Sequence, residues 1–124
     1  MVKKVILDSS FILSAVREKI DIFEEIPFMG YIIVIPEEVF AEIKHVKNSK
    51  QKLKERENAE LALKIMEVNR FESIKLGQSY VDNGLREFCK NHRDYIVATL
   101  DRALKKDISN YIMVIRGKKT LEVL

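Results

Sequence analysis

Short apolar runs alternate with stretches of helical periodicity along the whole chain. Three runs rich in β-branched residues, at 2–7, 31–35 and 95–99, predict buried strands. Signals of the same two kinds predict further strands at 71–76, 111–115 and 121–124, and helices at 11–16, 20–26, 36–46, 61–70, 79–89 and 102–108. This alternation predicts an α/β fold of three layers, α/β/α, around a central, mainly parallel sheet.

Prolines and small polar residues set the expected ends of these elements. Pro27 is expected to end one helix, and Pro36 to be the first residue of the next, because its fixed φ suits that position. Asn48 and Ser49 are expected to break that helix, and Ser79 is expected to open a later one.

Composition narrows the class of protein. A chain of 124 residues, 47% apolar and 33% charged, is expected to be one globular domain, 1–124, with a core of its own. No apolar run approaches the ~20 residues of a membrane helix, and the chain begins directly with a strand pattern, so neither a membrane partner nor a signal peptide is expected. The single cysteine, Cys89, cannot form an internal disulfide and is expected to pack in the core, which fits a cytoplasmic protein.

Two of the predicted strands lead into an aspartate that is followed by a helix. These aspartates are Asp8 and Asp101, and the carboxyl ends of parallel strands meet at one edge of a sheet, where ligands bind. Glu42 lies beside the apolar stripe of its helix, and Asp82 lies in the first turn of another. If these carboxylates share a pocket, their repulsion raises some of their pKa values or requires a cation. Oxygen ligands without histidine or cysteine suit Mg²⁺ or Mn²⁺.

Each carboxylate also has an ordinary structural explanation. Asp8 and Asp101 are suitable helix N-caps, and Ser79 with Asp82 has the spacing of a capping-box variant. Glu42 suits an exposed helix surface. The structural explanation is favoured for each residue taken alone, whereas the composition and order of the set favour a shared site.

Four segments together resemble the PIN-domain ribonucleases. They are Val5–Ser10, Pro36–Ile43, Val81–Asn83 and Tyr95–Lys106, which occur in the family's order and cover almost the whole chain. The stretch Val-Ala-Thr-Leu-Asp-Arg-Ala-Leu-Lys is the most specific, and is similar to the branch of archaeal stand-alone PIN proteins and eukaryotic small-subunit rRNA-processing nucleases. The resemblance implies an Mg²⁺- or Mn²⁺-dependent endoribonuclease that hydrolyses RNA phosphodiester bonds. Its acidic, metal-binding site would consist of Asp8, Glu42, Asp82 and Asp101.

The resemblance also implies supporting roles. Ser9 would match the small hydroxyl residue that often follows the first aspartate, and Thr99 a polar residue beside the last one. Asn83 departs from the family, which often has an acidic or small residue there. The pattern around Asp101 differs from that of the toxin branch, so rRNA processing is favoured over a toxin-type ribonuclease.

Basic residues near the acidic set are candidates for contacts with the RNA backbone. Arg102, Lys105 and Lys106 directly follow Asp101 and are preferred. The charged run over 50–56 is explained equally well as a solvated helix face. Further basic candidates in the first half of the chain are Arg17, Lys44, Lys47, Lys50, Lys52 and Lys54.

Two other functions stay open from the sequence. A catalytically silent RNA-binding or scaffold module on the same fold would retain the same residues. A phosphoreceiver-like signalling domain needs an aspartate at the end of a central strand, where Ile35 and Pro36 stand instead. The apolar helices over 11–26 and 61–68 leave surface for a homodimer, and a protein inhibitor or processing-complex partner is a further expectation.

Overall fold

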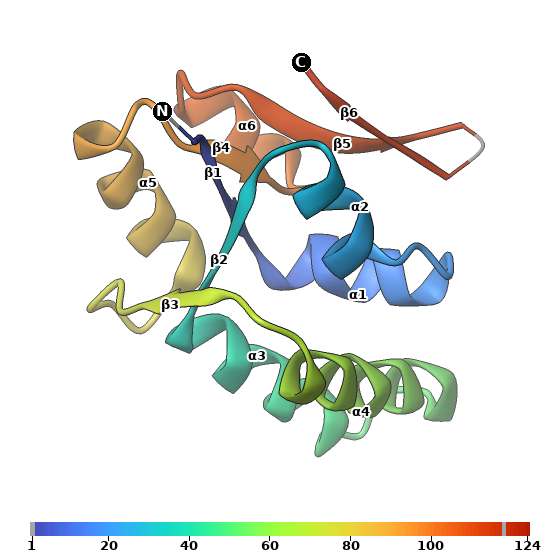
Figure 1. The fold of residues 1–124 in the computed structure, drawn as a ribbon. Coiled ribbons are helices and arrows are strands. Elements are labelled where there is room, and N and C mark those ends of the chain that lie inside the picture. The colour runs from blue at the N-terminus through green and yellow to red at the C-terminus, as the bar shows by residue number, and fades with distance from the viewer. Residues whose placement is uncertain (1, 118) are drawn as a thin grey trace.

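A six-stranded sheet forms the centre of the computed structural model, which describes residues 2–117 and 119–124 (Figure 1). The strands lie in the order β3-β2-β1-β4-β5-β6, and all neighbours are parallel except β5 and β6. Their bounds are β1 Lys4–Leu7, β2 Ile32–Pro36, β3 Glu72–Ile74, β4 Ile96–Ala98, β5 Ile112–Arg116 and β6 Thr120–Val123. The predicted mainly parallel α/β sheet is confirmed.

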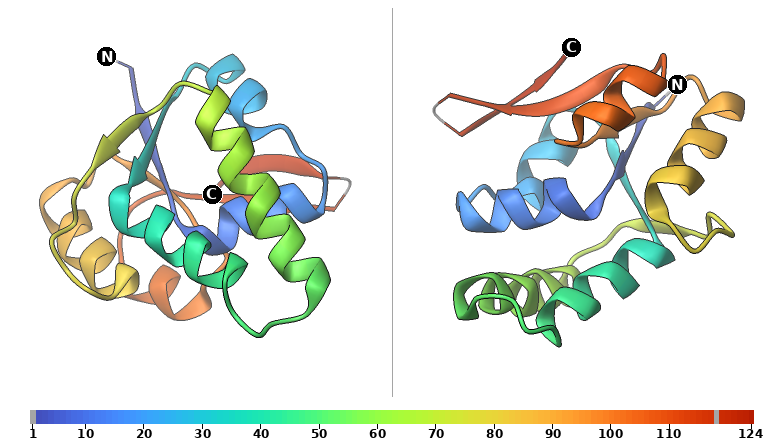
Figure 2. Two further views of the ribbon diagram at one scale, coloured as in Figure 1. Left: turned by 90° about the horizontal axis from the view of Figure 1, so that it is seen from below. Right: turned by 180° about the vertical axis from the view of Figure 1, so that it is seen from behind.

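Helices cover both faces of this sheet. Within the described residues they are α1 Ser9–Arg17, α2 Ile22–Phe28, α3 Glu37–Lys47, α4 Leu53–Val68, α5 Val81–Asn91 and α6 Arg102–Asp107. Helices α1, α3 and α4 contact one another, and α5 lies across β1 and β2 from α1 (Figures 1 and 2). The order of strands explains this arrangement. The chain moves toward one edge from β1 to β3 and toward the other from β3 to β5, so right-handed crossovers place α5 and α6 on the opposite face.

The strands in the middle of the sheet supply most of the core. Val5, Ile6 and Leu7 of β1 are completely buried, as is every residue of β4 apart from a trace of Ile96. Parallel strands are expected to be buried on both faces, because helices cover both faces of their sheet. Each large apolar side chain that is buried contributes about 1.5–3 kcal/mol to the stability of the fold. None of the helices among residues 2–117 and 119–124 is long and apolar enough to cross a membrane.

The two prolines occupy positions that differ from the prediction. Pro36 is the last residue of β2 and the N-cap of α3, with an extended ψ of 144°, so the helix begins at Glu37. Pro27 lies inside α2, which continues to Phe28. Proline has no backbone N–H, so α2 lacks the one helical hydrogen bond that this position would donate, and the helix ends one residue later.

Two helix starts were also predicted wrongly. Helix α5 begins at Val81 after Tyr80 as N-cap, so Ser79 neither opens the helix nor forms a capping box with Asp82. Helix α4 begins at Leu53, because the glutamates, lysine and arginine of its first turns are good helix formers even without an apolar stripe. The break at Asn48 is confirmed, since α3 ends at Lys47.

Candidate functional site

The register between β1 and β4 brings Asp8 next to Thr99. Leu7 and Ala98 are partners in the parallel ladder, and the N–H of Asp8 donates to the carbonyl of Ala98 at 3.1 Å. The next residue of each chain segment therefore projects from the same end of the sheet. The Thr99 hydroxyl donates to one carboxylate oxygen of Asp8, and both side chains are buried.

Asp8 is 3% exposed and uses both of its carboxylate oxygens. The oxygen that Thr99 leaves free accepts from the Ser10 hydroxyl at 2.8 Å and from the Phe11 N–H at 2.9 Å. The bond from Phe11 makes Asp8 the N-cap of α1, as the structural explanation of this residue predicted. Burial nevertheless raises the pKa of Asp8, because the loss of hydration outweighs these hydrogen bonds.

Asp101 and Asp82 form a close carboxyl pair between α6 and α5. Asp101 caps α6 by accepting from the N–H groups of Ala103 at 2.9 Å and Leu104 at 3.3 Å. Burial and a hydrogen bond with Asp101 raise the pKa of Asp82 to about 6. The same hydrogen bond, together with the N–H of Leu104, holds the pKa of Asp101 low. The two carboxyl groups therefore titrate together, and the opposite shifts of their pKa values describe the pair as a whole.

Glu42 reaches the same region from the second turn of α3. Its carboxylate accepts from the hydroxyl of Ser9 at 2.5 Å, which joins the start of α1 to α3. The negative charge of Glu42 also raises the pKa of Asp8, although burial is the larger cause. Glu42 also lines a cavity of about 330 Å³, together with Tyr80 and Asp82. All four carboxylates singled out in the sequence thus interact at one end of the sheet, in the pairs Asp8–Glu42, Asp8–Asp82 and Asp82–Asp101.

The possible metal ligands in this region are carboxylate oxygens, and their arrangement limits how many of them one ion could contact. Among residues 2–117 and 119–124, no three Asp, Glu, His or Cys side chains are arranged to hold an ion together. Asp8 already engages both of its oxygens. Mg²⁺ keeps several of its waters and takes one or two carboxylates. The Asp82–Asp101 pair fits such a hydrated ion, because a cation would offset the burial and the neighbouring negative charge that together raise the pKa of Asp82.

Arg86 belongs to the same region, although it was not among the residues predicted from the sequence. It lies one helical turn after Asp82 and donates to Asp107 at 2.8 Å and to Asn83 at 3.3 Å. Its positive charge lowers the pKa of both Asp82 and Asp101, as the last of the causes acting on each. The spacing of four residues between Asp82 and Arg86 on one helix face is the signal that could have found it.

One exposed tyrosine lies at the acidic cavity, and a second tyrosine packs inside the fold. Tyr80 lines this cavity and is 75% exposed. Tyr95 instead packs edge-on against Phe88, with ring centroids 5.0 Å apart. Of the basic residues that follow Asp101, Arg102 and Lys106 are exposed and Lys105 is half-buried.

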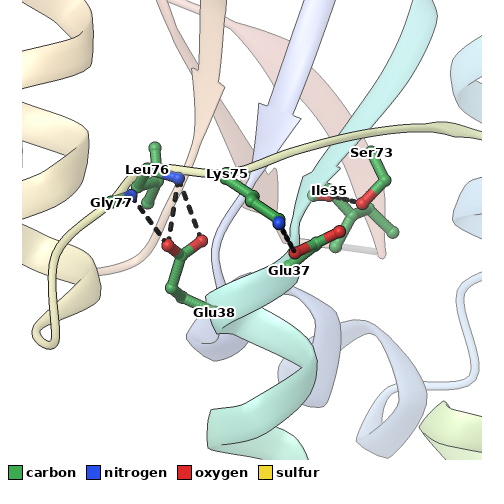
Figure 3. Close-up of polar contacts among 7 residues, drawn as sticks. All are labelled: Ile35, Glu37, Glu38, Ser73, Lys75, Leu76 and Gly77. Carbon is green, nitrogen blue, oxygen red and sulfur yellow. Dashed lines mark hydrogen bonds and ion pairs between the residues drawn. The ribbon is translucent and has the colours of Figure 1, made fainter.

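Glu38 fixes the loop that leads into α5 (Figure 3). Its carboxylate accepts from the N–H of Leu76, 3.0 Å from each oxygen, and from the N–H of Gly77 at 2.8 Å. Gly77 has a φ of 77°, a conformation that other residues rarely adopt. Gly84 of α5 then packs so closely on this loop that a Cβ at that position would lie 2.8 Å from the Cβ of Leu76. The loop and the start of α5, which carry Tyr80 and Asp82, are thereby held against α3.

Comparisons with known proteins agree with this geometry. Ribonuclease VapC4 of Methanocaldococcus jannaschii is 25% identical over 126 aligned positions, which cover 97% of this chain and 95% of that protein. The structure of the PIN domain endonuclease Utp24 is similar at a TM-score of 0.78 and 27% identity, covering 97% of this chain and 90% of that one. VapBC2 from Rickettsia felis, solved bound to a DNA fragment of its promoter, shares the fold at a TM-score of 0.53 and 16% identity, over 88% of this chain and 98% of that one.

The family model described as PIN like domain matches residues 5–119, a span that runs from β1 to the turn between β5 and β6. That span includes every carboxylate of the acidic region described above. The chain belongs to the PIN-like domain family.

Proposed function

We propose that the chain is a metal-dependent endoribonuclease that hydrolyses phosphodiester bonds in RNA. The observation that carries the proposal is the Asp82–Asp101 pair, with the buried Asp8 behind it and Glu42 beside it. Such a concentration of carboxylates at the end of a parallel sheet suits a bound cation better than it suits folding alone. The similarity to a ribonuclease and to an endonuclease supports the same conclusion.

Asp82 and Asp101 are the residues proposed to hold Mg²⁺ or Mn²⁺, with Asp8 and Glu42 as neighbouring acceptors. When bound, a divalent ion supplies charge stabilisation to the phosphate and lowers the pKa of a water. The protein orients the acceptors. Thr99 donates to Asp8, and its hydroxyl oxygen accepts from the N–H of Asp101 at 3.1 Å, so one side chain connects the two aspartates.

The remaining residues of the region are proposed to bind the substrate. Arg86 brings a positive charge next to Asp82 and Asp101, which favours the approach of an anionic phosphate. The exposed ring of Tyr80 offers a stacking surface for a base at the mouth of the cavity. Ser9 holds Glu42 in place through its hydroxyl.

We infer RNA processing as the cellular role, because the segment Val97–Lys105 is similar to the rRNA-processing branch of the family. A toxin-type ribonuclease is the alternative within the same chemistry. RNA is the proposed substrate, and a second copy of the chain, a protein inhibitor or a processing complex are the proposed partners.

A catalytically silent RNA-binding module is the second candidate. It is favoured by the hydrogen bonds that occupy both oxygens of Asp8, and by the lack of three metal-binding side chains in one place within the described residues. This alternative predicts that the chain binds RNA without cleaving it.

Cleavage of end-labelled RNA distinguishes the two candidates. Structured and single-stranded RNAs are incubated with the protein and Mn²⁺, Mg²⁺ or EDTA, beside Asp8→Asn, Asp101→Asn and the control Glu67→Gln on the exposed face of α4. Cleavage that requires the metal, is lost in both aspartate variants and persists in the control is the expected result. Cleavage that survives in either aspartate variant would refute the assignment of the site.

A parallel titration of metal binding by calorimetry separates the possible failures. If the wild type binds metal, Asp101→Asn does not, and neither protein cleaves RNA, the metal site is supported and the RNAs tested are excluded as substrates. RNA binding without metal binding would establish the silent module instead.

A further inference from the structure

A second cavity, of about 320 Å³, lies between the C-terminal half of α5 and the end of α6. Its charged and hydroxyl-bearing lining consists of Arg86, Lys90, Arg93, Lys106, Asp107 and Ser109. Four of these side chains are cations and one is a carboxylate. The cavity therefore differs in character from the acidic one beside it, which Glu42 and Asp82 line.

Most of the positive charge in this cavity is not neutralised by the protein. Asp107 is engaged by Arg86 at 2.8 Å. Lys90 pairs with the exposed Glu87 of its own helix at 3.5 Å, and such surface ion pairs contribute little to stability. Arg93 and Lys106 have no carboxylate within ion-pair distance in the described part of the chain. The Arg93 guanidinium instead donates to the hydroxyl of Ser109 at 3.4 Å, which turns both groups toward the same space.

The walls of the cavity are fixed by a buried asparagine. The amide nitrogen of Asn110 donates to the carbonyls of His92 at 2.9 Å and Tyr95 at 2.8 Å. These bonds tie the segment that follows α6 to the end of α5. Arg93, which lies between the two carbonyls in sequence, and Ser109, which precedes Asn110, are thus carried on connected backbone.

Arg86 joins the basic cavity to the acidic one, because its side chain lines both. An anion in the basic cavity would lie beside an anion at the acidic site, with this arginine between them. Consecutive phosphates of one nucleic-acid strand are ligands with this arrangement, since each nucleotide carries one phosphate.

We propose that the basic cavity binds the backbone phosphate that neighbours the scissile one, with Arg93 and Lys106 as its main contacts and Ser109 as a hydroxyl donor. This subsite rests on the proposed endoribonuclease function, because it takes the acidic cavity as the place of the scissile phosphate. Lys106 was expected from the sequence to contact the RNA backbone. Arg93 was not, since it lies on the far side of β4 in the sequence and reaches the cavity through the fold.

Binding of a fluorescent single-stranded RNA in EDTA tests the subsite without cleavage. The double variant Arg93→Gln with Lys106→Gln is compared with the wild type and with a matched control, Lys64→Gln with Arg70→Gln, at exposed positions in and just after α4. The salt dependence of affinity is measured for each by fluorescence anisotropy. Loss of one phosphate contact should reduce the slope of log K against log salt by about 0.7.

We expect the double variant to bind RNA about tenfold more weakly and with the smaller salt slope, whereas the control stays within about twofold of the wild type. Arg93→Lys should retain most of the affinity, because the charge is kept. Under cleaving conditions with Mn²⁺, the double variant should show a raised KM and an unchanged kcat. Thermal unfolding of each variant verifies that the fold is retained.

The subsite and the enzymatic function fail in different ways. Equal affinity and salt slope in the double variant and the wild type would overturn the subsite, whether or not RNA is cleaved. Absence of RNA binding by the wild type would overturn it as well. Weaker binding by the double variant, with no cleavage by any of the proteins, would support a phosphate-binding cavity and show that the RNA tested is bound without being a substrate.

Discussion

The hydroxyl of Thr99 donates a hydrogen bond to the buried carboxylate of Asp8, although the two residues are 91 positions apart in the chain. The contact follows from the pairing of Leu7 with Ala98, so it reports directly on the register between β1 and β4. It also partly offsets the cost of burying the carboxylate, which raises the pKa of Asp8.

Thr99→Val tests this contact, because valine has nearly the same shape and no donor. We expect the free energy of unfolding to fall by about 1–3 kcal/mol, since a buried acceptor loses its partner. We also expect the RNA-cleavage rate to reach its plateau at a higher pH, because the pKa of Asp8 rises further. Urea denaturation and a pH–rate profile measure the two effects. Thr99→Ser keeps the hydroxyl donor and should resemble the wild type in both measurements. A Thr99→Val variant that resembles the wild type would show that the hydrogen bond to Asp8 contributes nothing.

Asp82→Asn tests the carboxyl pair through the pH dependence of stability. The pKa of Asp82 rises from its ordinary 3.8 to about 6 in the folded protein. The folded state therefore binds this proton more tightly than the unfolded state, and the resulting stabilisation is complete below pH ~4 and is lost as the pH rises through ~6. We expect Asp82→Asn to have nearly the wild-type Tm at about pH 4 and a higher Tm at about pH 7, when both are measured in EDTA.

Mn²⁺ should reverse this order at about pH 7, because an ion that binds the folded state stabilises the wild type more than a variant with a weaker site. Asp94→Asn, at an exposed position outside the acidic region, is the matched control and should show neither effect. A difference between Asp82→Asn and wild type that is independent of pH would show that folding does not raise the pKa of Asp82.

Glu38→Gln tests how the loop before α5 is held. Glutamine has one acceptor oxygen in place of two, so it cannot keep all the bonds from the N–H groups of Leu76 and Gly77. We expect a loss of about 1–2 kcal/mol in the free energy of unfolding. Glu37→Gln is the control, because the side chain of Glu37 pairs with the exposed Lys75 at 4.0 Å (Figure 3). A loss of equal size in both variants would show that the Glu38 bonds have no special role.

Gly84→Ala tests the close packing of α5 on the same loop. In an exposed helix this substitution is stabilising, by up to about 1 kcal/mol. Here the added Cβ meets the Cβ of Leu76 at 2.8 Å, which is part of a side-chain stem that cannot rotate away. We therefore expect destabilisation of about 1–3 kcal/mol by urea denaturation, with a matching loss of RNA cleavage as Asp82 moves. Glu87→Ala, at an exposed position of α5, controls for helix propensity, and a stabilised Gly84→Ala would contradict the contact.

The sheet was predictable because its strands are buried on both faces and read as unbroken apolar runs. The apolar runs of β1, β2 and β4 show this signal plainly. Because these strands were expected to be parallel, their carboxyl ends were expected to meet at one edge of the sheet. The caps Asp8 and Asp101 were predictable for a related reason, since each stands between a strand and a helix. Such positions combine a local structural role with a place at the sheet edge.

Contacts between distant helices were not predictable from local pattern. Arg86 was missed because its importance depends on Asp101 and Asp107, which belong to another helix. The start of α5 was misplaced because Glu38 on α3 holds the preceding loop, and no residue near Ser79 signals that bond. Pairing of side chains across the fold is decided by packing, which single positions in a sequence do not record.

The place of β1 in the middle of the sheet has a consequence for synthesis on the ribosome. Strand β1 pairs with β2 on one side, but its other side stays open until residues 96–98 have been made. Asp8 therefore cannot meet Thr99 or Asp101 in a nascent chain that is shorter than this. Truncated translation products that end before β4 can retain Asp8, Glu42 and Asp82 but lack Thr99 and Asp101, so the proposed activity would arise only after β4 and Asp101 have been made.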